Sequence, residues 1–220
     1  MIGVQQVRFR RVGKPREIPA ALRAVDRVLA AVLLAGLLPL LGVIALLIRI
    51  LSGRSPLVAH VRVGYGGREL KMLKFRTMWP VWRPMAEGAV WIQTVVSEAI
   101  QDMKPRQDPR VTSRFARLCR TCSLDELPQL WHVVTGEMSL VGPRPVTRQE
   151  LDRHYGEQAD VVLSVRPGIT GLWQVLGRNS LHYRKRRRLD IYLARRYSLR
   201  LYAWVLLRTI PRVVSGKGAW

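Results

Sequence analysis

Two adjacent carboxylates stand near the middle of the chain, in the string Ser123-Leu124-Asp125-Glu126. An ionised carboxylate is a nucleophile towards phosphorus and forms an acyl-phosphate intermediate. Its neighbour is suited to hold Mg²⁺, a hard cation that takes one or two carboxylates together with substrate phosphates. The same string fits a capping box, in which Ser123 caps a helix and Glu126 reaches back to it. On its own the string favours helix capping and leaves phosphoryl chemistry open.

Phosphoryl chemistry would require cations to converge on the carboxylates, because it depends on positioning and charge neutralisation. Arg144 stands between two prolines, and Pro145 biases its backbone to an extended conformation, which restricts where the guanidinium points. Lys74 and Arg76 share one face if their segment is a strand. A turn at residues 166–168 offers backbone amides that suit a phosphate. Surface charge is the alternative explanation for each candidate: Lys74, Arg76, Arg120, Arg144, Arg166 and Gly168.

The whole composition points to an anionic partner. The chain has 220 residues, enough for one domain with a core, and a net charge of +22 from 37 basic and 15 acidic residues. Six of the basic residues are lysine, and arginine is the side chain preferred for forked contacts to phosphate. The partner is a nucleic acid, acidic lipid head groups or a phosphorylated small molecule. The basic run at 184–188 lacks the surrounding aromatic residues of a nucleic-acid module.

An apolar segment near the N-terminus is a candidate membrane helix. From residue 28 to residue 48 there are 21 consecutive uncharged residues, bounded by Arg27 and Arg49. As a straight helix they would extend about 31 Å, close to one hydrocarbon thickness. Pro39 removes a helical hydrogen bond near the middle, and both flanks are arginine-rich, which favours keeping both ends on the cytoplasmic side. We expect a Pro-kinked re-entrant helix, with a true span as the alternative.

The rest of the chain predicts a mainly α fold with a small β-hairpin. Residues 198–214 have the pattern of an amphipathic helix at a membrane interface, with arginines at multiples of four and Leu, Trp and Tyr elsewhere. An ordinary surface helix is the alternative there. Alternating residues and Gly64, Gly66 and Gly67 predict the hairpin within 60–80. Helices are also expected at 87–103 and over 113–138, where the acidic pair lies. The four arginines are Arg196, Arg200, Arg208 and Arg212.

Five strings along the chain occur together in a known family. They are LKFRTM (73–78), DPRVT (108–112), SLDELPQLW (123–131), GEMSLVGPRP (136–145) and RPGITGLWQVLGR (166–178). With these strings the sequence resembles the bacterial sugar transferases, monotopic phosphoglycosyltransferases that start cell-surface glycan assembly on polyprenyl phosphate. The resemblance covers residues 22–210, with Cys122 where Thr is common and Tyr202 and Trp204 where the family often has Asp and Lys.

The resemblance implies a two-step reaction. The carboxylate matching Asp125 attacks the β-phosphate of a UDP-sugar, releases UMP and keeps the phosphosugar. Undecaprenyl phosphate, or another polyprenyl phosphate from the bilayer, then takes the phosphosugar. Glu126 matches the Mg²⁺ ligand, and Asp190 matches an acidic residue late in the family pattern. The cationic positions around the phosphates are matched by Lys74, Arg120 and Arg144.

The expected organisation has three parts: a basic N-terminal segment (1–21), a re-entrant membrane helix (22–52), and a catalytic domain (53–220) that ends in an interfacial helix. The resemblance implies the bacterial inner membrane, with the site on the cytoplasmic face. The expected partners are the UDP-sugar, polyprenyl phosphate and anionic lipid, with no nucleic acid and with a homodimer left open. The rival hypothesis is a membrane-anchored basic protein that binds anionic lipid or nucleic acid without catalysis.

Overall fold

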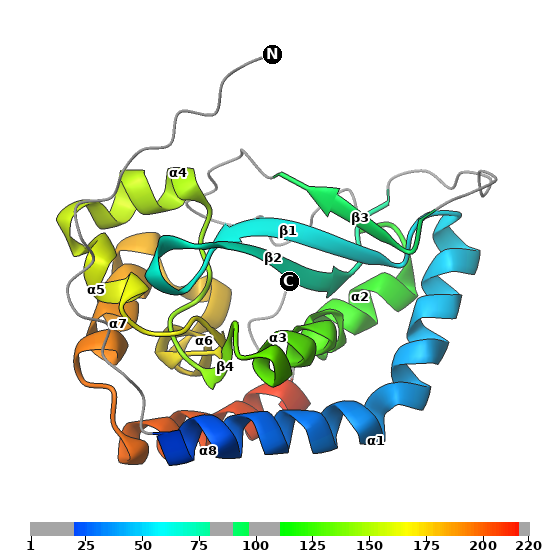
Figure 1. The fold of residues 1–220 in the computed structure, drawn as a ribbon. Coiled ribbons are helices and arrows are strands. Elements are labelled where there is room, and N and C mark those ends of the chain that lie inside the picture. Colours follow the sequence, from blue (N-terminus) through cyan, green and yellow to red (C-terminus); the bar gives the residue numbers. More distant parts are fainter. Residues whose placement is uncertain (1–19, 80–89, 97–110, 216–220) are drawn as a thin grey trace.

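The computed structural model describes residues 20–79, 90–96 and 111–215 and is mainly helical (Figure 1). Its helices are α1 (Ala20–Ser52), α2 (Arg114–Thr121), α3 (Leu130–Thr135), α4 (Arg148–Glu150), α5 (Ala159–Leu163), α6 (Leu172–Leu176), α7 (Tyr183–Arg195) and α8 (Leu199–Ser215). Its strands are β1 (Leu57–Val63), β2 (Glu69–Phe75), β3 (Ile92–Val95), β4 (Ser139–Val141) and β5 (Gly168–Thr170). The prediction of a mainly α fold with a small hairpin is confirmed.

The predicted hairpin is β1 and β2, which pair antiparallel with Leu57 opposite Phe75. Its turn contains Gly66 and Gly67, both at positive φ, a conformation that glycine adopts without steric cost. On the other side β1 pairs with β3 in parallel, so the helix expected over 87–103 is wrong at 92–95. The β-branched residues of 92–95 suit a strand, and the free edge of β1 supplies the hydrogen bonds. Residues 87–89 and 97–103 lie outside the described residues.

The helical stretch expected over 113–138 is present but interrupted, and the acidic pair lies at the interruption. Helix α2 ends at Thr121, a 3₁₀ turn covers Leu124–Gln129, and α3 follows. Ser123 has φ 57° and ψ 22°, in the left-handed region, and its side chain makes no capping hydrogen bond. The predicted capping box is therefore wrong. The left-handed Ser123 breaks the helical backbone, and Pro128 inside the turn has no N–H to donate.

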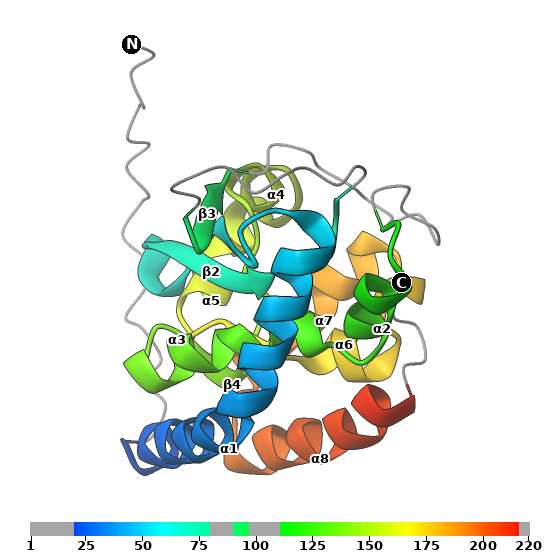
Figure 2. The same ribbon diagram turned by 90° about the vertical axis from the view of Figure 1, so that its right-hand side faces the viewer.

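Helix α1 is long and apolar. Its 33 residues correspond to about 50 Å of helix, more than one hydrocarbon thickness. Within the described ranges it is the one helix long and apolar enough to cross a membrane. The helix continues through Pro39. In both views it runs along the base of the domain beside α8 and then turns upward along one side (Figures 1 and 2).

Helix α8 confirms the predicted amphipathic helix. Tyr202 and Val205 are buried, whereas Leu207 and Ile210 are 67% and 61% exposed. Arg196 caps α7 and so does not share a helix with the three later arginines, which corrects that part of the pattern. The apolar side chains that α1 leaves exposed include Val28, Val32, Leu38, Val43, Leu46 and Ile50. The base of the domain therefore presents apolar side chains from both helices.

A buried carboxylate joins the two basal helices to the domain. Asp26, the one acidic residue of α1, is 4% exposed. Its carboxylate accepts hydrogen bonds from Ser139 Oγ of β4 at 2.5 Å and from Tyr202 Oη of α8. A buried charge is tolerated where such donors surround it. Asp26 thus fixes α1 against both β4 and α8.

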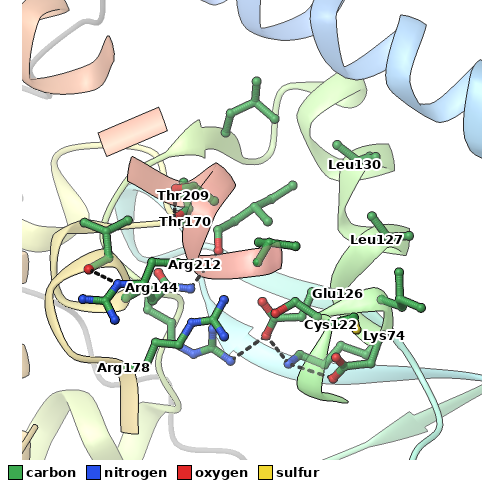
Figure 3. A pocket seen from close by; sticks show the side chains of 18 of the residues that line it. Lys74, Cys122, Glu126, Leu127, Leu130, Arg144, Thr170, Arg178, Thr209 and Arg212 are labelled. Atoms are coloured by element: carbon green, nitrogen blue, oxygen red, sulfur yellow. Dashed lines mark hydrogen bonds and ion pairs between the residues drawn. The ribbon is translucent and has the colours of Figure 1, made fainter. Parts of the chain in front are cut away.

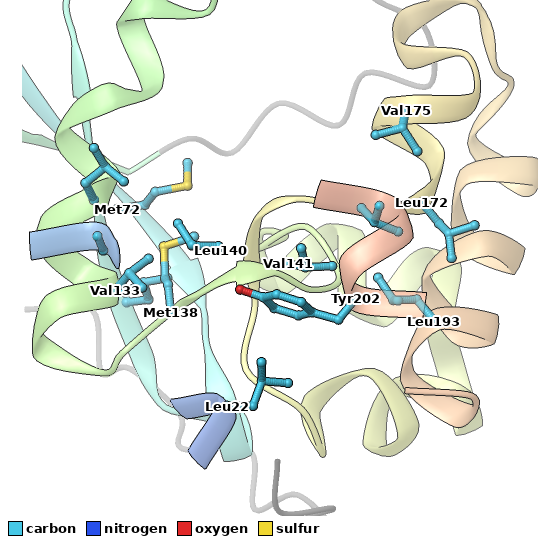
Figure 4. Close-up of a cluster of buried hydrophobic side chains, with 14 residues drawn as sticks. Leu22, Met72, Val133, Met138, Leu140, Val141, Leu172, Val175, Leu193 and Tyr202 are labelled. Carbon is cyan, nitrogen blue, oxygen red and sulfur yellow. The ribbon is translucent and has the colours of Figure 1, made fainter. Parts of the chain in front are cut away.

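The main core lies between the basal helices and the hairpin. Figure 4 shows side chains from α1, β2, α3, β4, α6, α7 and α8 gathered in one cluster. Val133, Val141 and Leu193 in this cluster are fully buried. The short strands β4 and β5 pair in parallel inside it, Ser139 with Gly168 and Val141 with Thr170. The loops that leave α3, β4 and α6 are therefore held by a packed interior.

Candidate active site

Asp125 and Glu126 meet two cations from distant segments. Glu126 Oε1 accepts from Lys74 Nζ of β2 at 2.6 Å and from Arg144 Nη2 at 3.1 Å (Figure 3). Lys74 Nζ also lies 4.0 Å from Asp125 Oδ2. Asp125 is 8% exposed. Four of the predicted site residues, Lys74, Asp125, Glu126 and Arg144, therefore form one cluster, with Glu126 at its centre.

The cations determine the charge state of Glu126. Burial alone would raise the pKa of its carboxyl, but the charges and hydrogen bonds of Lys74 and Arg144 hold the pKa well below its usual range. Burial likewise acts to lower the pKa of Arg144, and the carboxylate of Glu126 raises it. Burial and the nearby cations lower the pKa of His60, on β1, to about 4. At physiological pH the site therefore holds an ionised Glu126 and a neutral His60 imidazole.

Arg144 is positioned by close packing of backbone. The loop after β4 begins at Gly142, whose neighbour across the strands is Gly168. A Cβ on Gly168 would lie 2.0 Å from Gly142 N, and one on Gly171 would lie 2.6 Å from Gly142 O. The guanidinium of Arg144 lies over the Trp173 ring, 5.9 Å from its centroid. Glycine is required at this approach because any side chain would push the Arg144 loop away.

Lys74 is held through its neighbour on β2. The amide of Leu73 donates to His132 Nε2 at 3.1 Å, and His132 Nδ1 lies 2.7 Å from Glu137 Oε2. A neutral His132 that carries its proton on Nδ1 satisfies both contacts. This link ties β2 to α3, the helix that directly follows the acidic turn. Lys74 and the carboxylates are therefore held on one rigid support.

One cavity beside Asp125 is largely apolar, and we call it the apolar cavity. Its volume is about 420 Å³. Leu33 and Leu37 of α1 and Leu206 and Val213 of α8 contribute apolar walls. Figure 3 shows Glu126, Arg144, Arg178 and Arg212 around the same space. The apolar cavity therefore extends from the basal helices to the acidic turn.

A second cavity, the polar cavity, reaches the same carboxylate. It measures about 430 Å³, and its walls combine apolar residues with more charged side chains than the apolar cavity has, including Arg62, Arg76, Glu150 and Arg186. Tyr183 and Asp190 stand among its walls. The two cavities share five lining residues, Lys74, Arg120, Asp125, Arg144 and Trp173. Asp125 thus lies where an apolar and a polar cavity meet.

The remaining predicted site residues divide into two groups. Arg76 lines the polar cavity and is held by Ser55 O at 2.8 Å and Gln93 Oε1 at 2.5 Å. Asp190 also lines it, 1% exposed, and accepts from Tyr155 Oη at 3.1 Å. Arg166 instead donates to Gly136 O at 2.8 Å and lies over Tyr65, and neither it nor Gly168 lines either cavity. Their phosphate-binding role stays a prediction without support from this geometry.

The sequence matches the family model described as Bacterial sugar transferase over residues 19–216. The chain belongs to this family. The sugar transferase is 41% identical over 199 residues to the UDP-galactose-lipid carrier transferase of Erwinia amylovora. The match covers 90% of this chain and 41% of that protein. The chain thus spans less than half the length of that relative.

Two further relatives have related names. Over 201 residues the sugar transferase is 39% identical to the exopolysaccharide production protein ExoY of Rhizobium meliloti, covering 91% of this chain and 88% of that protein. Over 203 residues it is 36% identical to the UDP-glucose:undecaprenyl-phosphate glucose-1-phosphate transferase of Xanthomonas campestris pv. campestris, covering 89% of this chain and 39% of that protein. The resemblance found in the sequence is confirmed.

Some residues of the candidate site were not singled out from the sequence. Two guanidinium groups lie over the Trp173 ring, that of Arg144 at 5.9 Å and that of Arg186 at 5.0 Å from its centroid. Arg178 lines the apolar cavity and has φ 48°, one of two non-glycine residues at positive φ in the described part of the chain. Both Trp173 and Arg178 lie inside the family string at 166–178, and this string was the feature of the sequence that could have identified them as site residues.

Proposed function

We propose that this sugar transferase moves a sugar 1-phosphate from a UDP-sugar to a polyprenyl phosphate, undecaprenyl phosphate in bacteria. The observation that carries the proposal is the position of Asp125 between two cavities of different character. A nucleotide sugar is polar and anionic, which suits the polar cavity. A lipid phosphate has an apolar chain and an anionic head, which suits the apolar cavity. The names of the relatives support the same pair of substrates.

The first step forms a covalent intermediate. A carboxylate oxygen of Asp125 attacks the β-phosphorus of the donor, and the bond from that phosphorus to the bridging oxygen breaks. UMP leaves with the bridging oxygen, and the phosphosugar remains on Asp125 as an acyl phosphate. Lys74 and Arg144 lie beside the carboxylates, where their charges neutralise the phosphate oxygens as the bond breaks.

The second step regenerates the free carboxylate of Asp125. An oxygen of the lipid phosphate attacks the same phosphorus, and the acyl-phosphate bond to Asp125 breaks. The product is a polyprenyl diphosphate sugar, and both charge and atoms balance without a further reactant. Because the phosphosugar is bound to Asp125 only once UMP has left, the acceptor attacks phosphorus after UMP release.

Glu126 and Asp125 also fit a magnesium site. Both ion pairs of Glu126 use Oε1, and Mg²⁺ needs one or two carboxylates when substrate phosphates complete its coordination. Within the residues that the structure describes no cluster of three acidic, His or Cys ligands exists, so the donor phosphates would supply further oxygens. We propose that Glu126 holds Mg²⁺ together with the donor. The ion would neutralise charge on the diphosphate.

The membrane placement follows from the two basal helices. We propose that α1 enters the cytoplasmic leaflet of the inner membrane, bends at Pro39 and returns, while α8 lies in the interface. The exposed apolar residues of both helices and the bend of α1 support this arrangement. The exposed Arg200 and Arg208 of α8 would contact anionic lipid. This depth places the apolar cavity where a lipid phosphate resides.

The test is UMP release by the purified protein in detergent, with a panel of UDP-sugars, Mg²⁺, and undecaprenyl phosphate present or absent. We expect at most one UMP per enzyme without the lipid and sustained release with it. Mass spectrometry of the lipid-free sample should find the phosphosugar on Asp125. Asp125→Asn should abolish both signals, whereas the exposed Asp152→Asn should keep them.

The rival function, anionic binding without catalysis, predicts a different result. Binding of that kind weakens steeply with salt, because it depends on counterion release. It would be indifferent to Asp125→Asn. A protein that binds lipid vesicles but releases no UMP from any donor would overturn the transferase proposal and favour the rival.

A further inference from the structure

The cations of the site fall into three sets according to the cavity that they line. Lys74, Arg120 and Arg144 line both cavities. Arg62, Arg76 and Arg186 line the polar cavity alone. Arg178 and Arg212 line the apolar cavity alone. A separate pair of cations therefore faces the side of Asp125 that the basal helices approach.

Arg178 is held at this place by an uncommon backbone. It lies two residues after the end of α6, and its φ of 48° lies in the left-handed region, which is unfavourable for a residue with a Cβ. A side chain on the preceding Gly177 would meet Leu181 at 2.7 Å, so the local chain is closely packed. Backbone strain of this kind persists where the surroundings over-determine it, often at ligand sites.

The guanidinium of Arg178 has an unsatisfied group. Its Nη1 is buried and has no hydrogen-bond partner within the part of the chain that the structure describes. Burial and the nearby charge of Arg212 lower the pKa of Arg178, whereas the charge of Glu126 acts to raise it. A buried donor without a partner is costly unless a ligand supplies an acceptor.

Arg212 approaches the same cavity from α8. Its Nε donates to Val175 O at 2.8 Å, which fixes the guanidinium against α6. One turn before it, Thr209 Oγ1 and Thr170 Oγ1 lie 2.8 Å apart in the cavity wall. Figure 3 shows Arg178, Arg212 and the threonine pair around one space. Two arginines are thus set among leucine side chains of α1 and α8.

We propose that Arg178, assisted by Arg212, binds the phosphate of the lipid acceptor, whose hydrocarbon chain lies along Leu33, Leu37, Leu206 and Val213. The combination of an anion-binding group and an apolar channel fits a phosphate monoester on a long hydrocarbon chain. A nucleotide sugar has no part that needs the apolar walls. This assignment rests on the proposed transferase function. It identifies the residues of that site that bind the acceptor.

The two half-reactions allow the effect of a variant on the donor step and on the acceptor step to be measured separately. Single-turnover UMP release without lipid reports only the donor step, and titration with undecaprenyl phosphate reports the acceptor. Asn is the substitute of choice at position 178, because it tolerates a left-handed backbone. We expect Arg178→Asn to keep the UMP burst and to lower kcat/KM for the acceptor by about 10- to 100-fold. Arg178→Lys keeps the charge and should recover part of the loss.

Arg188→Asn is the matched control, because Arg188 is an exposed arginine of α7 outside both cavities. It should leave the burst and the acceptor titration at wild-type values. Equal thermal melting of the three variants and the wild type would show that each is folded. If Arg178→Asn unfolds, the UMP burst and the acceptor titration are compared with the wild type in Arg178→Lys and Arg212→Gln instead.

Three results would overturn the assignment. Loss of the UMP burst in a folded Arg178→Asn protein would place Arg178 on the donor side. Unchanged acceptor kinetics would remove it from substrate binding. Inhibition of the wild type by phosphatidylglycerol in nanodiscs, relieved by Arg178→Asn, would assign the arginine to membrane lipid instead. Failure of the proposed function looks different, since the wild type itself would then give no burst.

Discussion

Lys74 and Glu126 are separated by 52 positions in the sequence, and their charged groups meet at 2.6 Å. The contact joins the hairpin to the acidic turn. Arg144 reaches the same carboxylate oxygen at 3.1 Å from a third segment. The pairing explains how a buried carboxylate remains ionised, and it places a lysine beside Asp125. Four predictions follow from this cluster and from the elements that hold it.

Lys74→Met should reduce turnover by about 100-fold or more, because it removes one of the two cations beside the carboxylates. The rate of UMP release in the single-turnover assay is the measurement. Lys71→Met is the matched control, since Lys71 lies on the same strand but is exposed and lines neither cavity. Equal losses in the two variants would mean that general surface charge, rather than the Glu126 contact, supports the reaction.

Asp190→Asn should change how stability depends on pH. Burial raises the pKa of Asp190 from 3.8 to about 7, although the Tyr155 hydrogen bond and Arg144 act to lower it. Between these two values the folded protein holds a proton that the unfolded chain has lost, so wild-type stability falls as the pH rises. The variant cannot ionise there. We expect the melting temperature of the variant to rise relative to that of the wild type between about pH 4 and pH 7.

The control for that experiment is Asp152→Asn, because the side chain of Asp152 is exposed to solvent. Its melting curve should run parallel to the wild-type curve across the range. If Asp190→Asn also runs parallel, the carboxyl of Asp190 does not carry its proton into the neutral range.

Gly168→Ala should disrupt the site through its backbone. The new Cβ would lie 2.0 Å from Gly142 N, so the loop that carries Arg144 must move. We expect a loss of about 3 kcal/mol in unfolding free energy and loss of UMP release. Gly36→Ala is the matched control, because nothing lies within 4 Å of its Cβ position on α1. A fully active Gly168→Ala protein would show that the glycine contact does not position Arg144.

Tyr202→Phe should loosen the base of the domain. The change removes one hydrogen-bond donor from buried Asp26, which costs about 1–3 kcal/mol. Thermal unfolding in detergent measures the effect. Tyr192→Phe provides the comparison, since Tyr192 is 53% exposed on α7 and should melt like the wild type. Identical melting of both variants would mean that the Asp26 contact does not hold α8 to α1.

Local patterns predicted the elements of the fold that depend on nearby residues. The apolar run of α1, the glycine-rich turn after β1 and the apolar and basic pattern of α8 are each formed by residues close together in the sequence. The acidic turn was misjudged for a physical reason: Ser123 adopts a left-handed backbone, which its sequence neighbours do not require. Strand β3 was missed because its pairing with β1 lies 35 positions away, Leu57 opposite Ile92.

The sequence by itself determined the chemistry: a pair of carboxylates, the cations able to neutralise phosphate, and an apolar anchor, in strings that identify the family. Only the tertiary structure decided which cations contact the carboxylates. It brought Lys74 and Arg144 to Glu126 and directed Arg166 to Gly136 O instead. It also divided the space around Asp125 into two cavities. Such assignments depend on packing between segments that are distant in the chain, which no local pattern encodes.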